Sequence, residues 1–168
     1  LSLATLNGVF EQDVALETDI AIPRGSNQVI SLVARHNGVG DRNLYFARIH
    51  SSGNQFFATI LRNVNGTVTA VSTQNAIVLP VGNTLTGRMR FEGYGTSRKL
   101  FLDNNLVAFG SDSTPLLQNA GGVGIRTYMV GASVDNFHAS QLIKAPVSLP
   151  YGDDFNTATR SQLSDSWV

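Results

Sequence analysis

The feature that most constrains the fold is an alternation of apolar and polar residues with a period of two, which recurs along almost the whole chain. Between Asp13 and Ile22, Val14, Leu16 and Ile20 fall on one side of an extended backbone, and Glu17 lies on the other. This is the pattern of a β-strand with one buried face. A helix would need apolar residues every three or four positions, and no such stretch occurs here.

Further runs of this kind follow, separated by turn-forming residues such as Asn37-Gly38 and Asn65-Gly66. They lie at about 28–36, 43–51, 55–63, 67–73, 84–92, 99–109, 123–130 and 133–141. About nine short strands of this spacing predict an all-β fold, an antiparallel β-sandwich. Only residues 114–119 are compatible with a short helical turn.

The length of 168 residues corresponds to one domain. We expect residues 1–142 to form the sandwich and 143–150, which contain prolines, to form an extended connector. The predicted core comprises Val29, Leu32, Phe46, Phe57, Ile60, Met89, Phe91, Phe101, Leu102, Val123, Ile125 and Phe137. Because the chain starts at Leu1 rather than Met, we expect a mature fragment or a piece of a longer protein.

Composition argues against several classes of function. Twelve basic and twelve acidic residues give a formal net charge of zero, so no overall field favours nucleic acid or an anionic membrane surface. No apolar run approaches the roughly 20 residues needed to span a bilayer. The absence of cysteine excludes disulfides, zinc-thiolate sites and a thiol nucleophile.

Several motifs resemble the laminin-G-like and concanavalin A-like jelly-roll domains. Residues 29–47 resemble their paired strands, in which an Arg is followed by an Asn-rich turn and an aromatic strand. The segment LTGRMRFEGYGTSRKLFLDNNLVAFG resembles the long hairpin of that superfamily, turning on Asp103 and Asn104, and GGVGIR and SVDNFHAS resemble its last strands. The resemblance covers about residues 9–141 and implies a jelly-roll sandwich, an architecture that carries lectins, adhesion modules and glycoside hydrolases.

Sugar recognition uses aromatic rings together with Arg, Asn and Asp side chains on a sheet face or its rim. The candidate ligand-binding residues are Arg35, Tyr45, Arg48, Arg88, Arg90, Arg126 and Tyr128. Alternation places Arg88 and Arg90 on one face of a strand. This pair can receive an acidic glycan or can form ion pairs with Glu92, Asp103 or Glu17.

The jelly-roll resemblance also implies a structural Ca²⁺ between the first and last strands, built from carboxylates and backbone carbonyls. Asp135 matches the position in the last strand. The motif expected in the first strand, Asp153-Asp154-Phe155, stands at the other end of this chain. Asp135, Asp153 and Asp154 are therefore the candidate calcium ligands, and the alternative for Asp135 is a hydrogen bond to its neighbouring turn.

Catalysis is not expected. Glu17 and Asp19 share one strand face, as acid and nucleophile would in a glycoside hydrolase. The glycoside hydrolases of this fold carry a further Glu where this chain has Ala21 and Ile22, so no complete acid/base pair forms. The three histidines, at 36, 50 and 138, show no metal-ligand spacing, and we expect them to be partly exposed.

Residues 151–168 resemble the opening strand of a domain of the same type. They start the next repeat of a tandem protein, or they supply an edge strand to this sandwich or to a neighbour in a head-to-tail chain. We expect this segment to pack beside the strand around 135–137, with Phe155 and Trp167 as the residues of assembly.

Together these observations predict a non-catalytic, secreted or surface-displayed recognition or adhesion module that binds a glycan or a surface protein. A structural repeat of a surface layer or filament, assembled by strand donation, is the second possibility. A glycoside hydrolase-like enzyme is the third.

Overall fold

The computed structural model describes residues 2–77, 83–128 and 131–143. Strands make up most of this part, and the one short 3-10 helix, η1 (Pro115–Leu117), lies within the helical turn predicted at 114–119. The strands are β1 (Ser2–Thr5), β2 (Val14–Pro23), β3 (Val29–His36), β4 (Leu44–Ser52), β5 (Gln55–Val64), β6 (Thr67–Ala70), β7 (Asn75–Ile77), β8 (Thr84–Tyr94), β9 (Ser97–Leu102), β10 (Asn105–Ser111), β11 (Gly122–Tyr128) and β12 (Ser133–Gln141). Among the described residues, no helix is long and apolar enough to span a bilayer.

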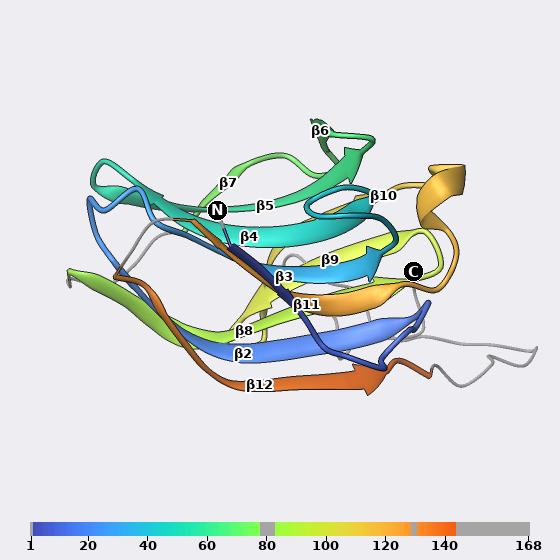
Figure 1. Cartoon of the computed structure of the whole chain (residues 1–168). Coiled ribbons are helices and arrows are strands. Elements are labelled where there is room, and N and C mark those ends of the chain that lie inside the picture. Colours follow the sequence, from blue (N-terminus) through green and yellow to red (C-terminus); the bar gives the residue numbers. More distant parts are fainter. Residues whose placement is uncertain (1, 78–82, 129–130, 144–168) are drawn as a thin grey trace, which may run out of the picture.

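Two antiparallel sheets pack face to face, which confirms the predicted sandwich (Figure 1). A seven-stranded sheet has the order β1-β11-β3-β4-β5-β6, with β7 also paired to β5. A five-stranded sheet has the order β10-β9-β8-β2-β12. In Figure 1 the strands of the seven-stranded sheet bend so that their ends rise away from the other sheet, which leaves its outer face concave.

The core between the sheets forms where the alternation predicted it. In β2, Val14, Leu16, Ile20 and Ile22 are buried, whereas Glu17 is partly exposed on the opposite face. Fully burying a side chain such as Leu16 stabilises the fold by roughly 1.5 to 3 kcal/mol. Leu32, Ile60, Met89, Phe91, Leu102 and Val123 belong to this core as predicted, and Ile125 and Phe137 pack against it.

Four predicted core residues, Val29, Phe46, Phe57 and Phe101, lie outside this intersheet core. The reason is the period of two, because residues three apart, such as Phe57 and Ile60, point to opposite faces of a strand. Phe56 is the residue that faces the core, and Phe57 lies on the outer face of its sheet. Phe101 is buried beside Arg90 on the outer face of the five-stranded sheet.

Phe46 belongs to a second, smaller apolar cluster on the outer face of the seven-stranded sheet. Val33, Leu44, Phe46 and Leu61 form this cluster, and Leu3 of β1 packs against it. The approach of β1 depends on Gly124, where a Cβ atom would collide with the backbone oxygen of Ala4. One end of the concave face is therefore covered by the apolar side chains of this cluster and by Leu3 of β1.

The predicted connector at 143–150 lies outside the described residues except for Ile143, and the segment 151–168 lies wholly outside them. The expected strand beside 135–137, with Phe155 and Trp167, stays a prediction. Among the described residues β12 is the last strand of the sandwich, and the domain boundary near residue 142 stays a prediction.

Candidate functional site

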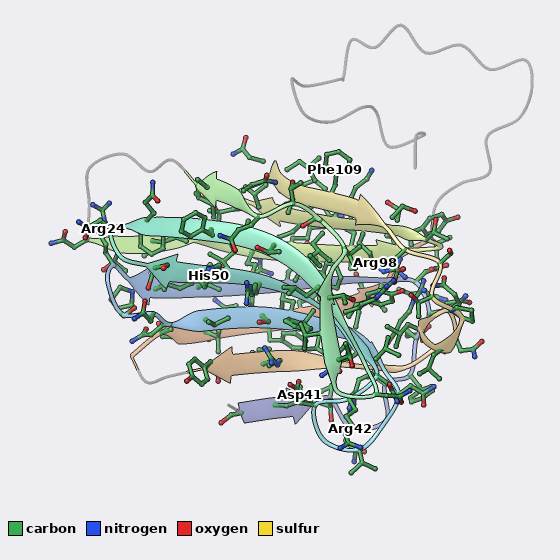
Figure 2. All side chains as sticks on the ribbon, turned by 90° about the horizontal axis from the view of Figure 1, so that it is seen from above. Arg24, Asp41, Arg42, His50, Arg98 and Phe109 are labelled. Carbon is green, nitrogen blue, oxygen red and sulfur yellow. The ribbon has the colours of Figure 1, made fainter. Side chains whose placement is uncertain are left out.

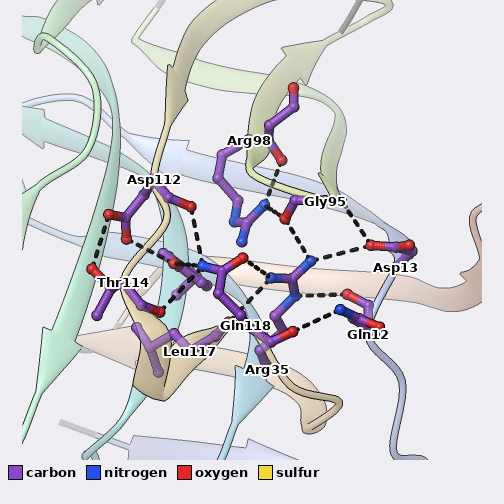
Figure 3. Close-up of polar contacts among 11 residues, drawn as sticks. Gln12, Asp13, Arg35, Gly95, Arg98, Asp112, Thr114, Leu117 and Gln118 are labelled. Carbon is purple, nitrogen blue, oxygen red and sulfur yellow. Dashed lines mark hydrogen bonds and ion pairs between the residues drawn. The ribbon is translucent and has the colours of Figure 1, made fainter.

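The structure separates the seven candidate ligand-binding residues into three groups. Arg35 lies in a buried polar network where the two sheets meet (Figure 3), and Tyr45 joins this network because Gln118 contacts both side chains. Arg88 and Arg90 lie on the outer face of the five-stranded sheet, and Arg48, Arg126 and Tyr128 belong to the outer face of the seven-stranded sheet. Each group has a different chemical environment.

Arg35 is 1% exposed, and its guanidinium is enclosed by acceptors from both sides of the sandwich. It donates to the backbone oxygens of Gln12 (2.7 Å), Gly95 (2.8 Å) and Leu117 (3.1 Å). It also pairs with the Asp13 carboxylate at 3.1 Å. A side chain with this many internal partners has a structural role, since little donor capacity is left for a ligand.

Tyr45 is also fully buried, and its hydroxyl donates to Asp112 at 2.7 Å. Burial raises the pKa of Tyr45 to about 12. The guanidinium of Arg98 lies 4.1 Å from the centroid of the Tyr45 ring, and burial lowers the pKa of Arg98 to about 10. Arg35, Tyr45 and Arg98 therefore form part of the interior and are not available to a glycan on the surface.

Arg88 and Arg90 form the ion pairs that the sequence offered as the alternative to glycan binding. Arg88 lies 3.0 Å from both Glu17 and Asp19, and Arg90 pairs with Glu92. Hydrogen bonds from Asn136 and from Arg88 hold the pKa of Asp19 below its usual value. A general acid needs a raised pKa, so Asp19 is suited to an ion pair and not to proton donation.

On the concave face, the strand register brings Arg48 and Arg126 into one row. Ser31 of β3 pairs with Arg126 of β11 on one side and with Arg48 of β4 on the other, and Arg48 pairs in turn with Thr59 of β5. Directly paired residues point to the same face of a sheet. Figure 2 looks onto this face and shows His50 upon it, with Asp41 near one end.

Arg126 is already occupied by the protein. Its Nε and Nη2 donate to the two oxygens of Asp41 at 2.8 and 2.9 Å, a bidentate ion pair. Its guanidinium also lies 4.4 Å from the centroid of the Phe46 ring. The backbone oxygen of Asp41 accepts from Asn63 of β5, which fixes the loop between β3 and β4 beside this sheet.

Arg48 has no such partner. Its Nε is buried without a hydrogen bond, and the same is true of Ser31 Oγ, His50 Nδ1 and Thr59 Oγ1. We call these four residues the Arg48 cluster. A buried polar atom without a partner costs about 1 to 3 kcal/mol, so four such atoms at neighbouring positions need a physical explanation.

The electrostatics of the cluster agree with this geometry. Burial, and then the nearby charge of Arg126, lower the pKa of Arg48 from its ordinary value. Burial, followed by the charge of Arg48, lowers the pKa of His50 to about 4. At neutral pH the cluster therefore holds a single cation beside a neutral imidazole.

An aromatic surface adjoins the cluster. The ring of His50 stacks on Phe57 with a centroid separation of 5.4 Å and an angle of 28° between the ring planes. Tyr128, 47% exposed, lies at the other end of the same row and is separated from His50 by Val29. Flat apolar rings beside polar groups are a common arrangement for holding a sugar ring.

Among the residues of this site, the sequence analysis identified Arg48, Arg126 and Tyr128 as ligand candidates but missed Ser31, His50, Phe57 and Thr59. A signal for them was present. The two residues Gly53-Asn54 between β4 and β5 read as a tight hairpin turn. That turn places His50 opposite Phe57 and Arg48 opposite Thr59, the register that the structure shows.

The described residues supply few candidate ligands for calcium. No group of three or more potential His, Asp or Glu ligands occurs within the described ranges. Asp135 lies within β12, where its Oδ1 accepts from the Asn136 backbone N–H at 2.8 Å beside the register shift between β12 and β2. Ca²⁺ takes six to eight oxygens, so a site here depends on Asp153 and Asp154, which lie outside the described residues.

No family model and no curated protein matches this sequence. Solved structures do match. The carbohydrate binding module CBM66 from Bacillus subtilis aligns with a TM-score of 0.63 and 20% identity, over 80% of this chain and 78% of that one. A tetrameric galectin from the ball sponge Cinachyrella sp. aligns with a TM-score of 0.57 and 11% identity, over 82% and 97% of the two chains.

A third structure, Bacteroides ovatus Xyloglucan PUL GH43B, aligns with a TM-score of 0.53 and 18% identity. The alignment covers 78% of this chain but only 28% of that longer one. These similarities confirm the fold, an antiparallel jelly-roll β-sandwich. At these identities they show nothing finer than the fold.

Proposed function

We propose that this chain is a non-catalytic carbohydrate-binding module, secreted or displayed at a cell surface, whose ligand lies on the concave face of the seven-stranded sheet. The observation that carries the proposal is the Arg48 cluster, four buried polar side-chain atoms without partners at adjacent positions. Sugar hydroxyls both donate and accept hydrogen bonds. A bound sugar can therefore supply partners to the partly exposed Arg48 and His50, whereas Ser31 and Thr59, 0% and 3% exposed, are too buried to contact it.

The setting of the cluster supports the same conclusion. The stacked rings of His50 and Phe57 provide an apolar surface for one face of a sugar ring. Two of the similar folds carry the names of a carbohydrate binding module and of galectins, which makes this architecture suitable for the role. The proposed ligand would lie across β3, β4 and β5, the strands that carry the Arg48 cluster.

An enzymatic role has less support. Glu17 and Asp19 share an outer face of the five-stranded sheet with Arg88, and both are engaged in ion pairs with it. The concave face carries no carboxylate on the strand positions next to Arg48, because those positions are Ser31 and Thr59. Among the described residues, the positions next to Arg48 therefore supply no pair of carboxylates for either side of a glycosidic bond.

The test is a glycan array followed by calorimetric titration of the retained sugars with the full chain. We expect binding at micromolar to millimolar dissociation constants, and we expect His50→Ala to weaken it by about tenfold through the loss of the ring that stacks on Phe57. Arg42→Ala is the matched control, since Arg42 is exposed on the loop beyond the cluster. Retention of no glycan, or equal weakening by both variants, would contradict the proposal.

A second candidate function rests on the edge of the five-stranded sheet. Among the described residues, β12 is the last strand in the order and has a partner on one side only. An open edge can accept a strand from another copy, so the chain would act as a structural repeat of a surface layer or filament. Sedimentation at increasing protein concentration tests it, because strand donation gives open-ended polymers that grow with concentration, whereas a closed oligomer of a sugar-binding module stops at a fixed size.

A further inference from the structure

The two arginines of the concave face differ in whether a carboxylate neutralises them. This difference bears on the chemical class of the sugar that the site would bind. The cations associated with the central row are Arg126 and Arg48. The Asp41 carboxylate neutralises Arg126 through two hydrogen bonds. Arg48 has no ion pair among the described residues, and its neighbours across the strands are the uncharged Ser31 and Thr59.

The positions diagonal to Arg48 do not supply an acid either. Along β4 its neighbours on the same face are Phe46 and His50. On the flanking strands the diagonal positions are Val29, Val33, Phe57 and Leu61. At these strand positions, all within the described part of the chain, the groups around Arg48 are apolar, neutral or, in the case of Arg126, of the same charge, so they leave this guanidinium without an anion.

From this we infer that the proposed sugar site takes an acidic sugar, and that Arg48 binds its carboxylate. The inference rests on the proposed function and adds the chemical class of the ligand. A carboxylate matches the planar fork of a guanidinium and forms two parallel hydrogen bonds with it. The hydroxyl groups of a neutral sugar can accept from Arg48, but they leave its charge uncompensated in a partly buried place.

The number of cations favours one carboxylate over a densely sulfated chain. With Arg126 held by Asp41 and His50 neutral at pH 7, one free positive charge is available at the cluster. The cross-strand neighbours of Arg48, Ser31 and Thr59, are buried and uncharged, so they add no second positive charge. Uronic acids and sialic acids share this chemistry, in which a single carboxylate sits on a hydroxylated ring.

The experiment compares each acidic sugar with its own methyl ester, which removes the charge and keeps the rest of the molecule. The probes are trigalacturonate and sialyllactose, each as free acid and as methyl ester, titrated calorimetrically into the full chain at pH 7. We expect at least one acid to bind about tenfold or more tightly than its ester. The two pairs of probes distinguish a uronate from a sialate.

Variants connect the preference to Arg48. Arg48→Gln removes the charge and should abolish the difference between acid and ester, whereas Arg48→Lys should retain part of it and Arg42→Ala all of it. In about 1 M NaCl, where the Debye length is about 3 Å, the difference should shrink but persist, because a partly buried pair is screened less than an exposed one.

The possible failures are distinguishable. If neutral oligosaccharides from the array bind, with Arg48→Gln weakening them, while neither acid exceeds its ester, the sugar site stands and the acidic ligand is wrong. If the acids are preferred but Arg48→Gln keeps the preference, the assignment to Arg48 is wrong. If neither the array nor the acidic probes show binding, the proposed function itself fails.

Discussion

At the scale of single residues, the two arginines that lie opposite Ser31 on the neighbouring strands differ in their interaction partners. Arg126 has a carboxylate and an aromatic ring as partners, whereas Arg48 has a buried Nε with none. A residue kept only for stability would not be expected to leave this cost uncompensated. A binding residue can have an unpaired polar atom in the free protein, because the ligand supplies the partner.

This difference gives a prediction for stability. Arg48→Met should raise the free energy of unfolding by about 1 kcal/mol, since it removes an unpaired buried donor and keeps an apolar stem of similar length. Arg126→Met should lower it, because Asp41 would lose its partner. Urea denaturation of both variants measures this. A loss of stability in Arg48→Met as large as that in Arg126→Met would mean that Arg48 is structural.

At the scale of strands, the positions of the strands were predictable from the sequence. Which face of each strand packs into the core was harder to predict. The alternation in β2 has a single solution, because Glu17 and Asp19 exclude the other face from the core. In β5 the pair Phe56-Phe57 permits either face, and in β9 the pair Phe101-Leu102 does the same. The choice depends on cross-strand partners, which the local pattern does not contain.

The candidate site was also hard to predict because the local sequence does not contain the cross-strand partners. Arg35 and Arg48 both follow apolar strand residues in the sequence and were equally good ligand candidates. Arg35 adopts a left-handed backbone conformation with φ of 52°, beside the register shift between β3 and β11, and its side chain enters the interior. A bulge of this kind depends on the pairing with β11, about 90 residues later in the chain. The local sequence around Arg35 therefore does not predict it.

The outer face of β2 and β8 provides a prediction at this scale. The double variant Glu17→Ala/Asp19→Ala should change the free energy of unfolding by about 0.5 kcal/mol and leave sugar binding unaltered, because exposed ion pairs contribute little. Both residues lie on the sheet opposite to the proposed site. Thermal unfolding and the titration described above measure the two effects. A glycosidase activity that disappears in this variant would show that the enzymatic interpretation had been rejected wrongly.

At the scale of the whole molecule, the two sheets are joined by more than the apolar core. Arg35 belongs to β3 of the seven-stranded sheet, whereas Asp13 precedes β2 and Gly95 follows β8 in the five-stranded sheet. The Leu117 oxygen adds η1 to the same guanidinium (Figure 3). One side chain thus connects both sheets and the 3-10 helix at one end of the sandwich.

Removing that side chain should therefore affect the whole fold. Arg35→Met removes the donor from the backbone oxygens of Gln12 and Leu117, and it leaves Gly95 O and Asp13 with one donor each, Arg98 and the Gly95 N–H. Breaking a buried pair of this kind costs about 3 to 5 kcal/mol. The matched control is Arg88→Met, an exposed arginine with two carboxylate partners, which should cost no more than about 1 kcal/mol. Urea denaturation followed by circular dichroism gives both values. If Arg35→Met costs no more than Arg88→Met, the network at this end does not hold the sheets together, and the apolar core alone accounts for their packing.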